Sequence, residues 1–380
     1  MKTVLHLERK FTSNTETFII NQVNLIAKYN VIVVTIRSLN NFECNKKIIT
    51  PNKRSAISNT AKVLSKSTCE SLFNQLKDYK IDLIHVHYLV DALYFKKLVE
   101  KFNVPKIVSS YGYDVTSFPN IFFGFGRLLL KTVFRHYDYF FAMSQDMKTD
   151  LVKLGCKNEK IMVHYYGTET SKFNNTSRDY KRGNKIKILS VGTLEEKKAQ
   201  LLVIEALYLL EKKHPNVNYE YHIIGGGPDE NKIMEKCIKY NMTNKVFIHG
   251  YIHHHSKELK KFYDDCNIFI LPSITTKSGE KEGIPGTIVE AMSNGLPVIS
   301  TYHAGIPSII ENVVHGLLVK ERDIQALEEA IYSLISNIEL CRKIGQNAQT
   351  RAINELDLKA KTIELENIYK NIIDNDQKNL

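Results

Sequence analysis

The sequence lacks several features that would place it in well-defined classes of protein. None of its hydrophobic runs approaches the 18 residues of a membrane-spanning helix, and the apolar stretch in MKTVLHLERKF is too short for a secretion signal. Six cysteines are scattered, with no CxxC pair and no spacing typical of a metal site. No GxxxxGK(S/T) motif occurs, so a P-loop nucleotide site is excluded. We therefore expect a soluble, cytosolic protein with reduced, mostly buried cysteines, no metal and no cofactor.

Positive charge is concentrated in the first half of the chain. Residues 1–175 hold 25 Lys and Arg against 14 Asp and Glu, whereas residues 176–380 hold 27 of each. The whole net charge of +11 therefore lies in the first half, which favours an anionic partner there. The pI of about 9.1 is compatible with nucleic-acid binding, but no recognised module or aromatic stacking pattern accompanies it. We expect no nucleic-acid partner.

Both halves alternate short β-rich runs with helical stretches, which predicts parallel strands joined by crossover helices. Strands are predicted over 3–7, 31–36, 82–88, 106–111, 139–144, 187–192, 219–225, 245–250, 267–273, 296–301 and 316–319. Helices are predicted over 16–29, 67–79, 91–103, 121–137, 145–154, 199–213, 229–241, 256–265, 287–294, 306–312, 323–335 and, as a long tail, 337–373. The fold class is α/β, with two doubly wound, Rossmann-like domains that face each other across a cleft.

A polar segment without periodicity, 173–184, is interpreted as the linker between these domains. The first domain is placed at 1–175 and the second at 176–355. The last helix, 356–380, is expected to return to the first domain, because the tail is longer than one sheet needs.

Three loops of the second half lead from a strand into a helix. They are SVGTLEEKKA (190–199), IIGGGPDE (223–230) and EGIPGTIVEAM (282–292). Glycine turns that open a helix present free N–H groups and the positive end of the helix dipole, which suit a phosphate. One such turn is weak evidence, but three on one sheet, with a lysine beside one of them, favour an anion or nucleotide site.

Two glutamates, Glu282 and Glu290, flank the glycine-rich part of the third loop. Sugar hydroxyls are held well by charged acceptors, so a carboxylate pair beside a phosphate cradle suits a nucleotide sugar. The alternative is structural: Thr287 and Glu290 have the spacing of a capping box, and Glu282 lies in a charged run typical of a solvated loop. The loop by itself leaves both interpretations open.

The run from Ser190 to Val319 resembles the retaining glycosyltransferases of family 4, which have the GT-B fold. The resemblance is carried by the three loops together with FIHGYI, FYDDCNIFILPS and AGIPSIIENVVHGLLV. In the first half, TETFIINQ, DLIHVHY, SYGYDV and KIMVHYYGTETSKF resemble the bacterial capsule, exopolysaccharide and lipopolysaccharide branch. The resemblance implies metal-independent transfer of a hexose from a nucleotide-diphosphate sugar to a lipid-linked or growing polysaccharide acceptor, with retention of anomeric configuration.

The resemblance also implies roles for individual residues. Glu282 would act beside the donor sugar, Glu290 would hold the ribose, and Lys198 would neutralise the diphosphate. The other donor-binding residues that it implies are Gly192, Thr193, Lys197, Gly225, Gly227, Tyr251, Ile252, Gly283, Ile284, Pro285, Gly286 and Thr287.

Three departures from the family pattern concern one donor-binding residue, one catalytic residue and the first strand–helix loop. Thr193 stands where the family usually has arginine, so Lys197 or a residue of the first half is the candidate replacement. Tyr111 stands at the histidine of an HG-x-D motif, and because a tyrosine is neither a cation nor a base near pH 7, its catalytic role would be positioning. The first strand–helix loop lacks the usual glycine pair. Glu16 and Asp114 remain the acceptor-side candidates, and Glu16 is equally explained as a charge at a helix N-terminus.

The segment 121–135, IFFGFGRLLLKTVFR, is predicted to face a membrane. Arg127, Lys131 and Arg135 recur every four residues beside Phe122 and Phe123, as in helices that lie on anionic lipid. An ordinary amphipathic helix packed on its own domain is the alternative. The charge excess of the first half favours a protein that is cytoplasmic and peripheral on the inner face of the cell membrane.

Two other classes of function remain open. A nucleotide-sugar epimerase or a phosphorylase has a comparable scaffold, and Thr193 and Tyr111 leave room for a non-catalytic protein that kept the fold. His253, His254 and His255 are interpreted as surface loop, since three consecutive side chains do not easily converge on one ion. His85 and His87 are interpreted as satisfied core histidines.

Overall fold

The computed structural model describes residues 1–11, 17–38, 43–52, 64–176, 178–180, 185–254 and 256–378, without the side chains of Phe122 and Phe123. The chain forms two compact units, Met1–Gly167 with Leu358–Leu380, and Thr168–Asp357. It passes from one unit to the other twice, and the two crossing points are bonded together. The Thr168 N–H donates to the Leu356 carbonyl at 2.9 Å.

The first unit is built on a parallel sheet, which has seven strands among its described residues, in the order β3-β2-β1-β4-β5-β6-β7. The strands are β1 (Thr3–Phe11), β2 (Asn30–Ser38), β3 (Lys47–Ile49), β4 (Leu83–His87), β5 (Lys106–Ser109), β6 (Tyr139–Ala142) and β7 (Ile161–Val163). Side chains alternate between the two faces, so that Leu5 and Leu7 enter one core and Val4 the other. Both faces of the sheet are therefore buried.

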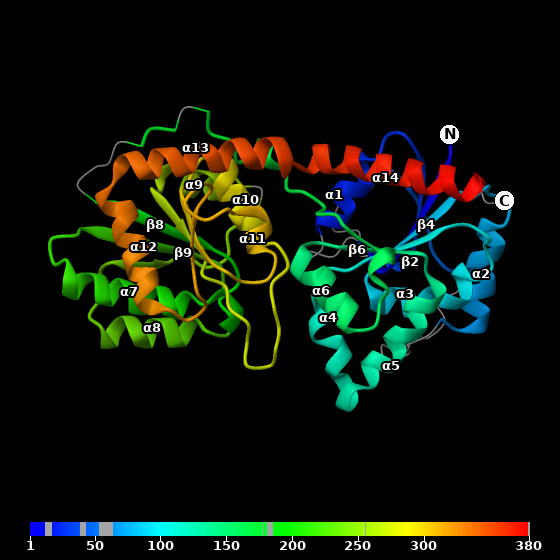
Figure 1. The fold of residues 1–380 in the computed structure, drawn as a ribbon, viewed down its shortest axis with the longest axis horizontal. Helices are drawn as coiled ribbons and strands as arrows, with labels where there is room; N and C mark the ends of the chain where they lie inside the picture. Colours follow the sequence, from blue (N-terminus) through cyan, green and yellow to red (C-terminus); the bar gives the residue numbers. More distant parts are fainter. Residues whose placement is uncertain are drawn as a thin grey trace. The chain divides into compact units, whose positions relative to one another are not determined.

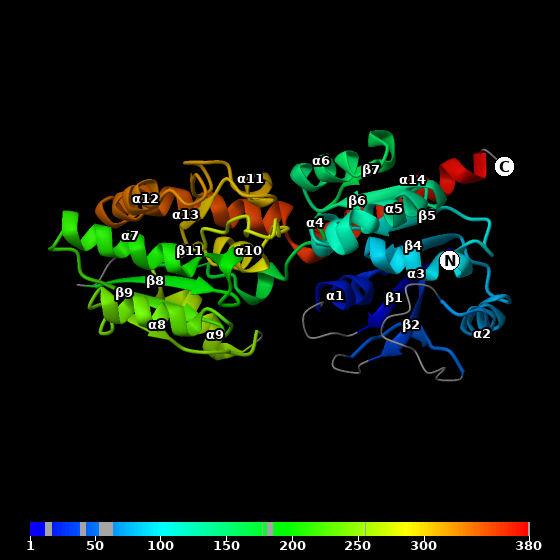
Figure 2. The same cartoon turned by 90° about the horizontal axis from the view of Figure 1, so that it is seen from below.

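Helices cover both faces of this sheet (Figures 1 and 2). One face carries α2 (Lys66–Leu76), α3 (Leu89–Val99), α4 (Tyr113–Thr116), η1 (Phe118–Asn120), α5 (Ile121–His136) and α6 (Gln145–Lys153). The other face carries α1 (Thr17–Leu25) and the last helix, α14 (Leu358–Lys378). A short turn, η2 (Asn158–Lys160), precedes β7.

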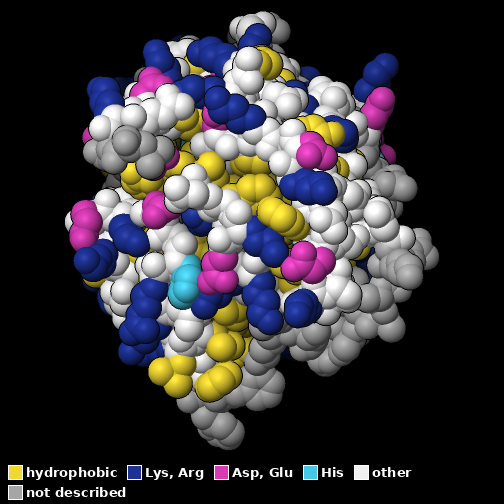
Figure 3. Space-filling view, turned by 90° about the vertical axis from the view of Figure 1, so that its right-hand side faces the viewer, with side chains coloured by type: hydrophobic (Ala, Val, Ile, Leu, Met, Phe, Trp, Pro, Cys, Tyr) yellow, Lys and Arg dark blue, Asp and Glu magenta, His cyan; other side chains and the backbone are white. Residues whose placement is uncertain are grey.

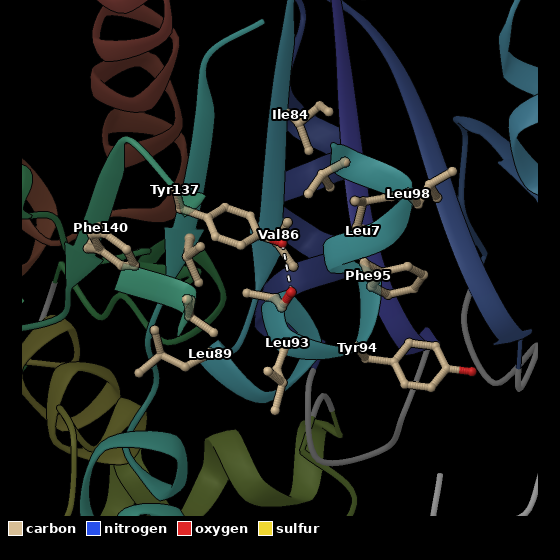
Figure 4. Packing of buried hydrophobic residues seen from close by; sticks show 14 of the residues in the cluster. Leu7, Ile84, Val86, Leu89, Leu93, Tyr94, Phe95, Leu98, Tyr137 and Phe140 are labelled. Carbon is tan, nitrogen blue, oxygen red and sulfur yellow. Dashed lines mark hydrogen bonds between the residues drawn. The ribbon is translucent and has the colours of Figure 1, made fainter. Parts of the chain in front are cut away.

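The core under α3 and α5 shows how the first unit is held together. Leu93 and Phe95 of α3 pack with Ile84 and Val86 of β4, and Tyr137 reaches the same core, where its hydroxyl donates to the Ala92 carbonyl at 2.7 Å (Figure 4). Each fully buried side chain of this size contributes about 1.5–3 kcal/mol.

The second unit repeats the architecture with a sheet of six parallel strands, counted over its described part, in the order β10-β9-β8-β11-β12-β13. They are β8 (Ile186–Val191), β9 (Tyr219–Ile224), β10 (Val246–Ile248), β11 (Ile268–Ile270), β12 (Val298–Thr301) and β13 (Leu317–Val319). One face packs on α7 (Gln200–Lys213), α8 (Glu230–Lys239) and α12 (Ile324–Ser336). Ile268 and Ile270 of β11 point into this core. Phe269 points to the other face, where its ring stacks on Tyr263 at 6.0 Å between centroids.

The remaining elements complete the second unit. They are η3 (Thr170–Lys172), η4 (Glu196–Lys198), α9 (Lys257–Asp265), α10 (Gly286–Ser293), α11 (Ile306–Ile309) and α13 (Ile338–Glu355). In Figure 1, α9, α10 and α13 lie above the sheet and α7 and α8 below it. Polar caps start several of these helices: Ser256 accepts from the Leu259 N–H at 3.1 Å and Asn337 from the Leu340 N–H at 2.9 Å. Each cap stabilises its helix by about 1 kcal/mol.

The interpretation of 173–184 as an interdomain linker is wrong for its described part. Arg178 is built into the second unit, where it donates to the Asn294 side chain at 2.7 Å and to the Tyr263 carbonyl at 3.1 Å. The Tyr180 hydroxyl donates to the Gly295 carbonyl at 2.8 Å. Polar composition misleads here, because the half-buried side chains of Arg178 and Tyr180 bond to groups of the second unit.

Two further expectations are tested by the fold. All six cysteines lie in the described ranges, none forms a disulfide and five are buried, as predicted, with Cys44 half-buried. Along the described residues, none of the helices combines the length and the apolar character needed to cross a membrane.

Candidate active site

The loop after β8 brings a lysine to the carboxyl end of the second sheet. A Cβ added to Gly192 would lie 3.6 Å from Cδ and Cε of Lys198, so the lysine side chain runs along the glycine backbone. Lys198 ends the short turn η4, and Ala199, with a left-handed φ of 55°, redirects the chain into α7. The local backbone therefore turns Lys198 back toward the end of β8.

Two glycines of the neighbouring β9 loop are required by close backbone packing. A Cβ on Gly225 would lie 1.9 Å from the Gly192 carbonyl oxygen, and one on Gly227 would lie 2.4 Å from the Leu194 carbonyl oxygen. The Gly192 N–H donates to the Ile224 carbonyl at 2.9 Å, which holds the two loops together. Only glycine fits at both positions.

The third loop places Glu282 against Lys198. The Nζ of Lys198 lies 2.8 Å from Oε1 of Glu282, and the two side chains are 13% and 10% exposed. Burial raises the pKa of the Glu282 carboxyl, but Lys198, helped by Lys197, outweighs burial and brings the pKa below its ordinary value. Glu282 is therefore ionised at neutral pH, and the two residues assigned to sugar and diphosphate share one environment.

The buried side chain of His303 holds the backbone of the Glu282 loop. The Glu282 N–H donates to Nε2 of His303 at 3.0 Å, and Nδ1 of His303 donates to Oε1 of Glu321 at 2.7 Å. An acceptor at Nε2 and a donor at Nδ1 fix His303 as one neutral tautomer. Glu321 also accepts from the Thr275 N–H at 2.8 Å. Burial raises the pKa of Glu321, but the bonds from Thr275 and His303 lower it below its ordinary value.

The capping-box interpretation of Glu290 is wrong. Helix α10 begins at Gly286, its cap residue Pro285 makes no side-chain bond to the helix, and Glu290 lies more than one turn inside. Its carboxylate, 2% exposed, accepts from the Tyr263 hydroxyl at 2.8 Å and pairs with Nε2 of His254 at 2.6 Å. Glu290 is therefore an oriented, buried carboxylate.

His254 and Tyr263 are site residues that the sequence did not reveal. His254 belongs to the loop interpreted as surface, and its side chain is 44% exposed, but the ring also bonds to the buried Glu290; His255 lies outside the described residues. Burial lowers the pKa of His254, but the bond and charge of Glu290 outweigh it, so the pKa is raised. Burial and Glu290 together raise the pKa of Tyr263 well above its ordinary value. Tyr263 is the seventh residue of the polar helix α9, and its position gave no sequence signal for this contact.

The expected replacement for arginine at Thr193 is itself engaged by carboxylates. Lys197 forms ion pairs with Glu280 at 2.8 Å and with Glu195 at 3.4 Å. Burial lowers the pKa of Lys197, but the Glu280 bond and the surrounding carboxylates raise it above its ordinary value. The Thr193 hydroxyl donates to the same Glu195 carboxylate. Lys197 is therefore charged and lies beside Lys198 in the same turn.

The other predicted donor residues surround these groups. Ile284 and Pro285 are buried, while Gly283 carries the carbonyl that accepts from the Gly305 N–H at 3.2 Å. The Thr287 hydroxyl is buried in the first turn of α10 and meets no hydrogen-bonding group among the described residues. Near the Gly225 loop, the ring of Tyr251 is 79% exposed and Ile252 is half-buried.

The predicted acceptor-side residues of the first unit differ in their surroundings. Tyr111 is half-buried, and its hydroxyl lies 2.6 Å from Nδ1 of His87. Asp114 is fully buried, and its carboxylate accepts from the N–H groups of Leu89, Tyr111 and Gly112 at 2.9–3.1 Å. Burial raises the pKa of Asp114, and those bonds oppose the rise. Asp114 thus shapes the loop of Tyr111, and Glu16 lies outside the described residues.

One set of side chains in the described ranges has the proximity needed to hold a metal ion. The ligand atoms of His6, His85 and His87 all lie within 4.8 Å of one another, and all three residues are buried. Every ring nitrogen of the set, however, already has a partner: another imidazole of the set or a hydroxyl group. The set is a hydrogen-bonded network of core histidines, as predicted for His85 and His87.

Helix α5 exposes both apolar and cationic side chains. Leu128 and Phe125 are 57% and 49% exposed, and the three cations Arg127, Lys131 and Arg135 are exposed as well. Phe122 and Phe123 have side chains outside the described set. Figure 3 shows Lys and Arg spread widely over one face of the first unit, with fewer Asp and Glu.

Two parallel sheets, each covered by helices on both faces, define the GT-B fold, and solved structures of this fold superimpose on the chain. HepE of Anabaena, solved in complex with UDP, aligns with 98% of this chain and 100% of its own at a TM-score of 0.77 and 17% identity. Sucrose-phosphate synthase of Thermosynechococcus elongatus aligns with a TM-score of 0.75 and 18% identity over 98% of this chain and 99% of its own.

The sequence matches two family descriptions that together run through most of the chain. Residues 23–172 match "Glycosyltransferase Family 4" and residues 172–351 match "Glycosyl transferases group 1". The chain belongs to the glycosyltransferase family that these two descriptions define.

Two of the curated relatives carry names of glycosyltransferases in colanic acid and amylovoran biosynthesis. The colanic acid biosynthesis glycosyltransferase WcaL of Salmonella typhimurium is 35% identical over 234 residues, 58% of this chain and 56% of WcaL. The amylovoran biosynthesis glycosyltransferase AmsK of Erwinia amylovora is 37% identical over 202 residues, 53% of this chain and 48% of AmsK. The chain spans about half the length of the curated relatives it matches.

Proposed function

We propose that the protein is a retaining glycosyltransferase that moves a hexose from a nucleotide-diphosphate sugar to a lipid-linked or growing exopolysaccharide, without a metal ion. The observation that carries the proposal is the buried ion pair of Lys198 and Glu282, 2.8 Å apart, at the meeting point of three strand–helix loops. The family and the biosynthetic relatives support the same class of reaction.

The charges of Lys198 and Glu282 indicate the role of each residue in the donor site. The ammonium of Lys198 neutralises the diphosphate as its negative charge develops on departure, and the N-terminus of α10 adds a positive dipole end. Glu282 is ionised, so it cannot protonate the leaving group and instead accepts hydrogen bonds from the sugar or stabilises its developing positive charge. The leaving group is therefore stabilised electrostatically and not by a proton from this carboxyl.

The nucleoside part has its own partners in the same unit. Glu290 is oriented by Tyr263 and His254 and offers a fixed, negative acceptor for the two ribose hydroxyls. The Thr287 hydroxyl is available as a further polar contact, and the exposed ring of Tyr251 suits the face of a base.

Release of nucleoside diphosphate tests the site. Nucleotide sugars are first screened for an increase in Tm, and the stabilising donor is then incubated with acceptor. We expect Lys198→Ala and Glu282→Gln each to reduce transfer by about 10²–10³-fold. The exposed pair Lys185 and Glu220, also 2.8 Å apart in the second unit, provides the controls Lys185→Ala and Glu220→Gln, which retain activity. Unchanged transfer in both site variants would refute the assignment.

Stereochemistry and metal dependence are measured separately. The anomeric configuration of the product, followed by NMR from the start of the reaction, must equal that of the donor. Transfer must also continue in excess chelator. An inverted product contradicts the retaining mechanism, and loss of activity that added Mg²⁺ restores contradicts metal independence.

The exposed face of α5 is proposed to bring the first unit to an anionic membrane, where a lipid-linked acceptor lies. Apolar Phe125 and Leu128 would enter the interface while Arg127, Lys131 and Arg135 bind lipid phosphates. This assignment would also account for the excess positive charge of residues 1–175.

Flotation with liposomes containing anionic lipid tests the membrane proposal. Wild-type protein should float, and Lys131→Glu combined with Leu128→Ser should leave most of it in solution. Lys157→Glu reverses an exposed charge outside α5 and should still float. Wild-type protein that stays wholly in solution contradicts the proposal.

A further inference from the structure

Three buried imidazoles line up on one face of the first sheet. His6 of β1 is paired in register with His85 of β4, and His87 lies two residues further along the same strand. Residues two apart in a strand point to the same side, so all three rings share one face. Their centroids are 4.7–5.2 Å apart, and each residue is 1% exposed.

Hydrogen bonds connect these rings to Tyr111 at one end and to Tyr369 of α14 at the other. The Tyr111 hydroxyl lies 2.6 Å from Nδ1 of His87, and Nε2 of His87 lies 3.0 Å from Nδ1 of His6. From His6 the path continues through Nε2 to the Tyr369 hydroxyl at 3.4 Å. The Tyr369 hydroxyl in turn lies 2.5 Å from Nδ1 of His85, and Nε2 of His85 lies 2.7 Å from the Ser109 hydroxyl.

These contacts admit one simple order of protons. If Tyr111 donates to Nδ1 of His87, then Nε2 of His87 donates to Nδ1 of His6, and Nε2 of His6 donates to Tyr369. Tyr369 then donates to Nδ1 of His85, whose Nε2 donates to Ser109. Each imidazole is neutral and carries its proton on Nε2, and no buried nitrogen is left unsatisfied.

We propose that His6, His85, His87, Ser109 and Tyr369 are positioning residues that fix the direction of the Tyr111 hydroxyl, so that its oxygen is presented to the acceptor with its proton directed inward. The inference rests on the proposed transferase function for its consequence, but not for the proton order. Tyr111 stands where the family has a histidine, and the network makes it an acceptor of hydrogen bonds in place of a cation.

The electrical state of the network agrees with this order. Burial, and to a lesser degree Lys46, lowers the pKa of His6 to about 3, and burial lowers the pKa values of His85 and His87 well below the ordinary range. Burial raises the pKa of Tyr111 well above its ordinary value, and a hydrogen bond from Ser109 opposes the rise. All these groups are therefore uncharged at neutral pH.

Nitrogen NMR of the full-length protein tests the proton order without any substrate. Long-range ¹⁵N–¹H spectra at pH 7 should give neutral Nε2–H tautomers for His6, His85 and His87, identified by single His→Gln variants. Tyr369→Phe should shift the signals of His87, which it does not touch, because the network transmits the change. The control Tyr29→Phe removes a hydroxyl bonded to the Glu366 carbonyl on the same helix and should leave His87 unshifted.

Three outcomes overturn the proton order. They are a doubly protonated imidazole at pH 7, an Nδ1–H tautomer at any of the three rings, and a His87 signal that is unshifted in Tyr369→Phe. Titration with Zn²⁺ adds a fourth: stoichiometric binding that shifts all three histidines identifies a metal site in place of the network. Unchanged spectra after Zn²⁺ addition support the network.

Kinetics test the consequence for Tyr111. Tyr111→Phe and Tyr369→Phe should each lower kcat by about tenfold with the donor KM unchanged, since each removes orientation worth about one hydrogen bond. Combined, they should be no slower than Tyr111→Phe alone, because both act through the same hydroxyl. Tyr29→Phe should retain the wild-type kcat. Multiplicative losses would overturn the positioning role.

The two readouts separate the possible failures. If the spectra give the expected tautomers and transmission but no nucleotide sugar is turned over, the network stands and the proposed function falls. If transfer is normal and the spectra contradict the order, the positioning role falls and the proposed function stands.

Discussion

The two units of the molecule bury polar side chains in opposite electrical states. In the first unit, His6, His85 and His87 bond to one another and to hydroxyl groups, and burial keeps them neutral. In the second, Lys198 pairs with Glu282, and the half-exposed His254, whose pKa is raised, pairs with the buried Glu290. The same architecture, a parallel sheet with helices on both faces, thus supports a network that orders protons and a site that gathers charge. The partner of each buried group, and not the fold, decides which one forms.

The two histidine environments therefore respond to pH with opposite signs. A histidine whose pKa is lowered by folding loses its contribution to stability as the pH falls below the unfolded value of 6.5. A histidine whose pKa is raised keeps its contribution below 6.5 and loses it as the pH rises through the folded value.

The charged unit depends on the close approach of its glycine loops. Gly225→Ala places a Cβ 1.9 Å from the Gly192 carbonyl oxygen at a φ of +138°, so we expect a loss of more than about 3 kcal/mol in urea unfolding. Gly226→Ala is the matched control in the same turn, because nothing lies within 4 Å of its Cβ, and should change stability by under about 1 kcal/mol. Equal effects of the two substitutions would contradict this packing.

Removing one member of the buried ion pair should cost more stability than removing one member of an exposed pair. Lys198→Met leaves Glu282 in a site where it is 10% exposed, and we expect a loss of about 3 kcal/mol. Lys185→Met breaks the exposed pair with Glu220 and should change the free energy of unfolding by under about 1 kcal/mol. If Lys198→Met lowers the free energy of unfolding as little as the control does, the Lys198–Glu282 pair is not buried and this explanation is wrong.

Acid should destabilise the first unit through its neutral histidines. Below pH 6.5 the unfolded chain protonates His6 while the folded chain does not until about pH 3. Stability should fall by on the order of 1.4 kcal/mol per pH unit for this residue within that window. His6→Asn should flatten the dependence of Tm on pH between 6 and 4, and an unchanged slope would show that His6 is not neutral when folded.

The smallest expected effect has the opposite sign and belongs to His254. His254→Gln should lower Tm at pH 6, where the protonated ring pairs with Glu290, and the difference from wild type should shrink as the pH rises above the raised pKa. The ring is 44% exposed, so screening limits the loss to under about 1 kcal/mol. A difference that grows with pH would refute the charged pair.

Much of the fold could be predicted from the sequence, because period-two and helical patterns are local properties. The strands β3 and β7 were missed, since Lys47–Ile49 and Ile161–Val163 hold too few residues to show a period. The equally short β10 and β13 were predicted because they lie in apolar runs next to a glycine, KVFIHG and GLLV. The single predicted tail is two helices, separated at Leu356 and Asp357, where the chain leaves the second unit. Such breaks depend on tertiary packing.

The candidate site was predictable only where loop motifs carry it. Lys198 and Glu282 follow from the glycine turns and the family resemblance, and their pairing places them together. His303 and His254 lie in loops with no pattern of their own, so their bonds to Glu282 and Glu290 required coordinates. The network of His6 with His87 depends on the register between β1 and β4, which no local pattern encodes.

The proposed transferase needs a nucleotide-diphosphate sugar to bind to the charged loops of the second unit. Hydrogen–deuterium exchange of the full chain, with and without the nucleotide sugar that most raises Tm, tests it most directly. Binding at these loops should slow exchange in residues 190–200, 223–230 and 282–290. Protection confined to the peptides of Tyr111 and the buried histidines, with those three loops unchanged, would contradict it.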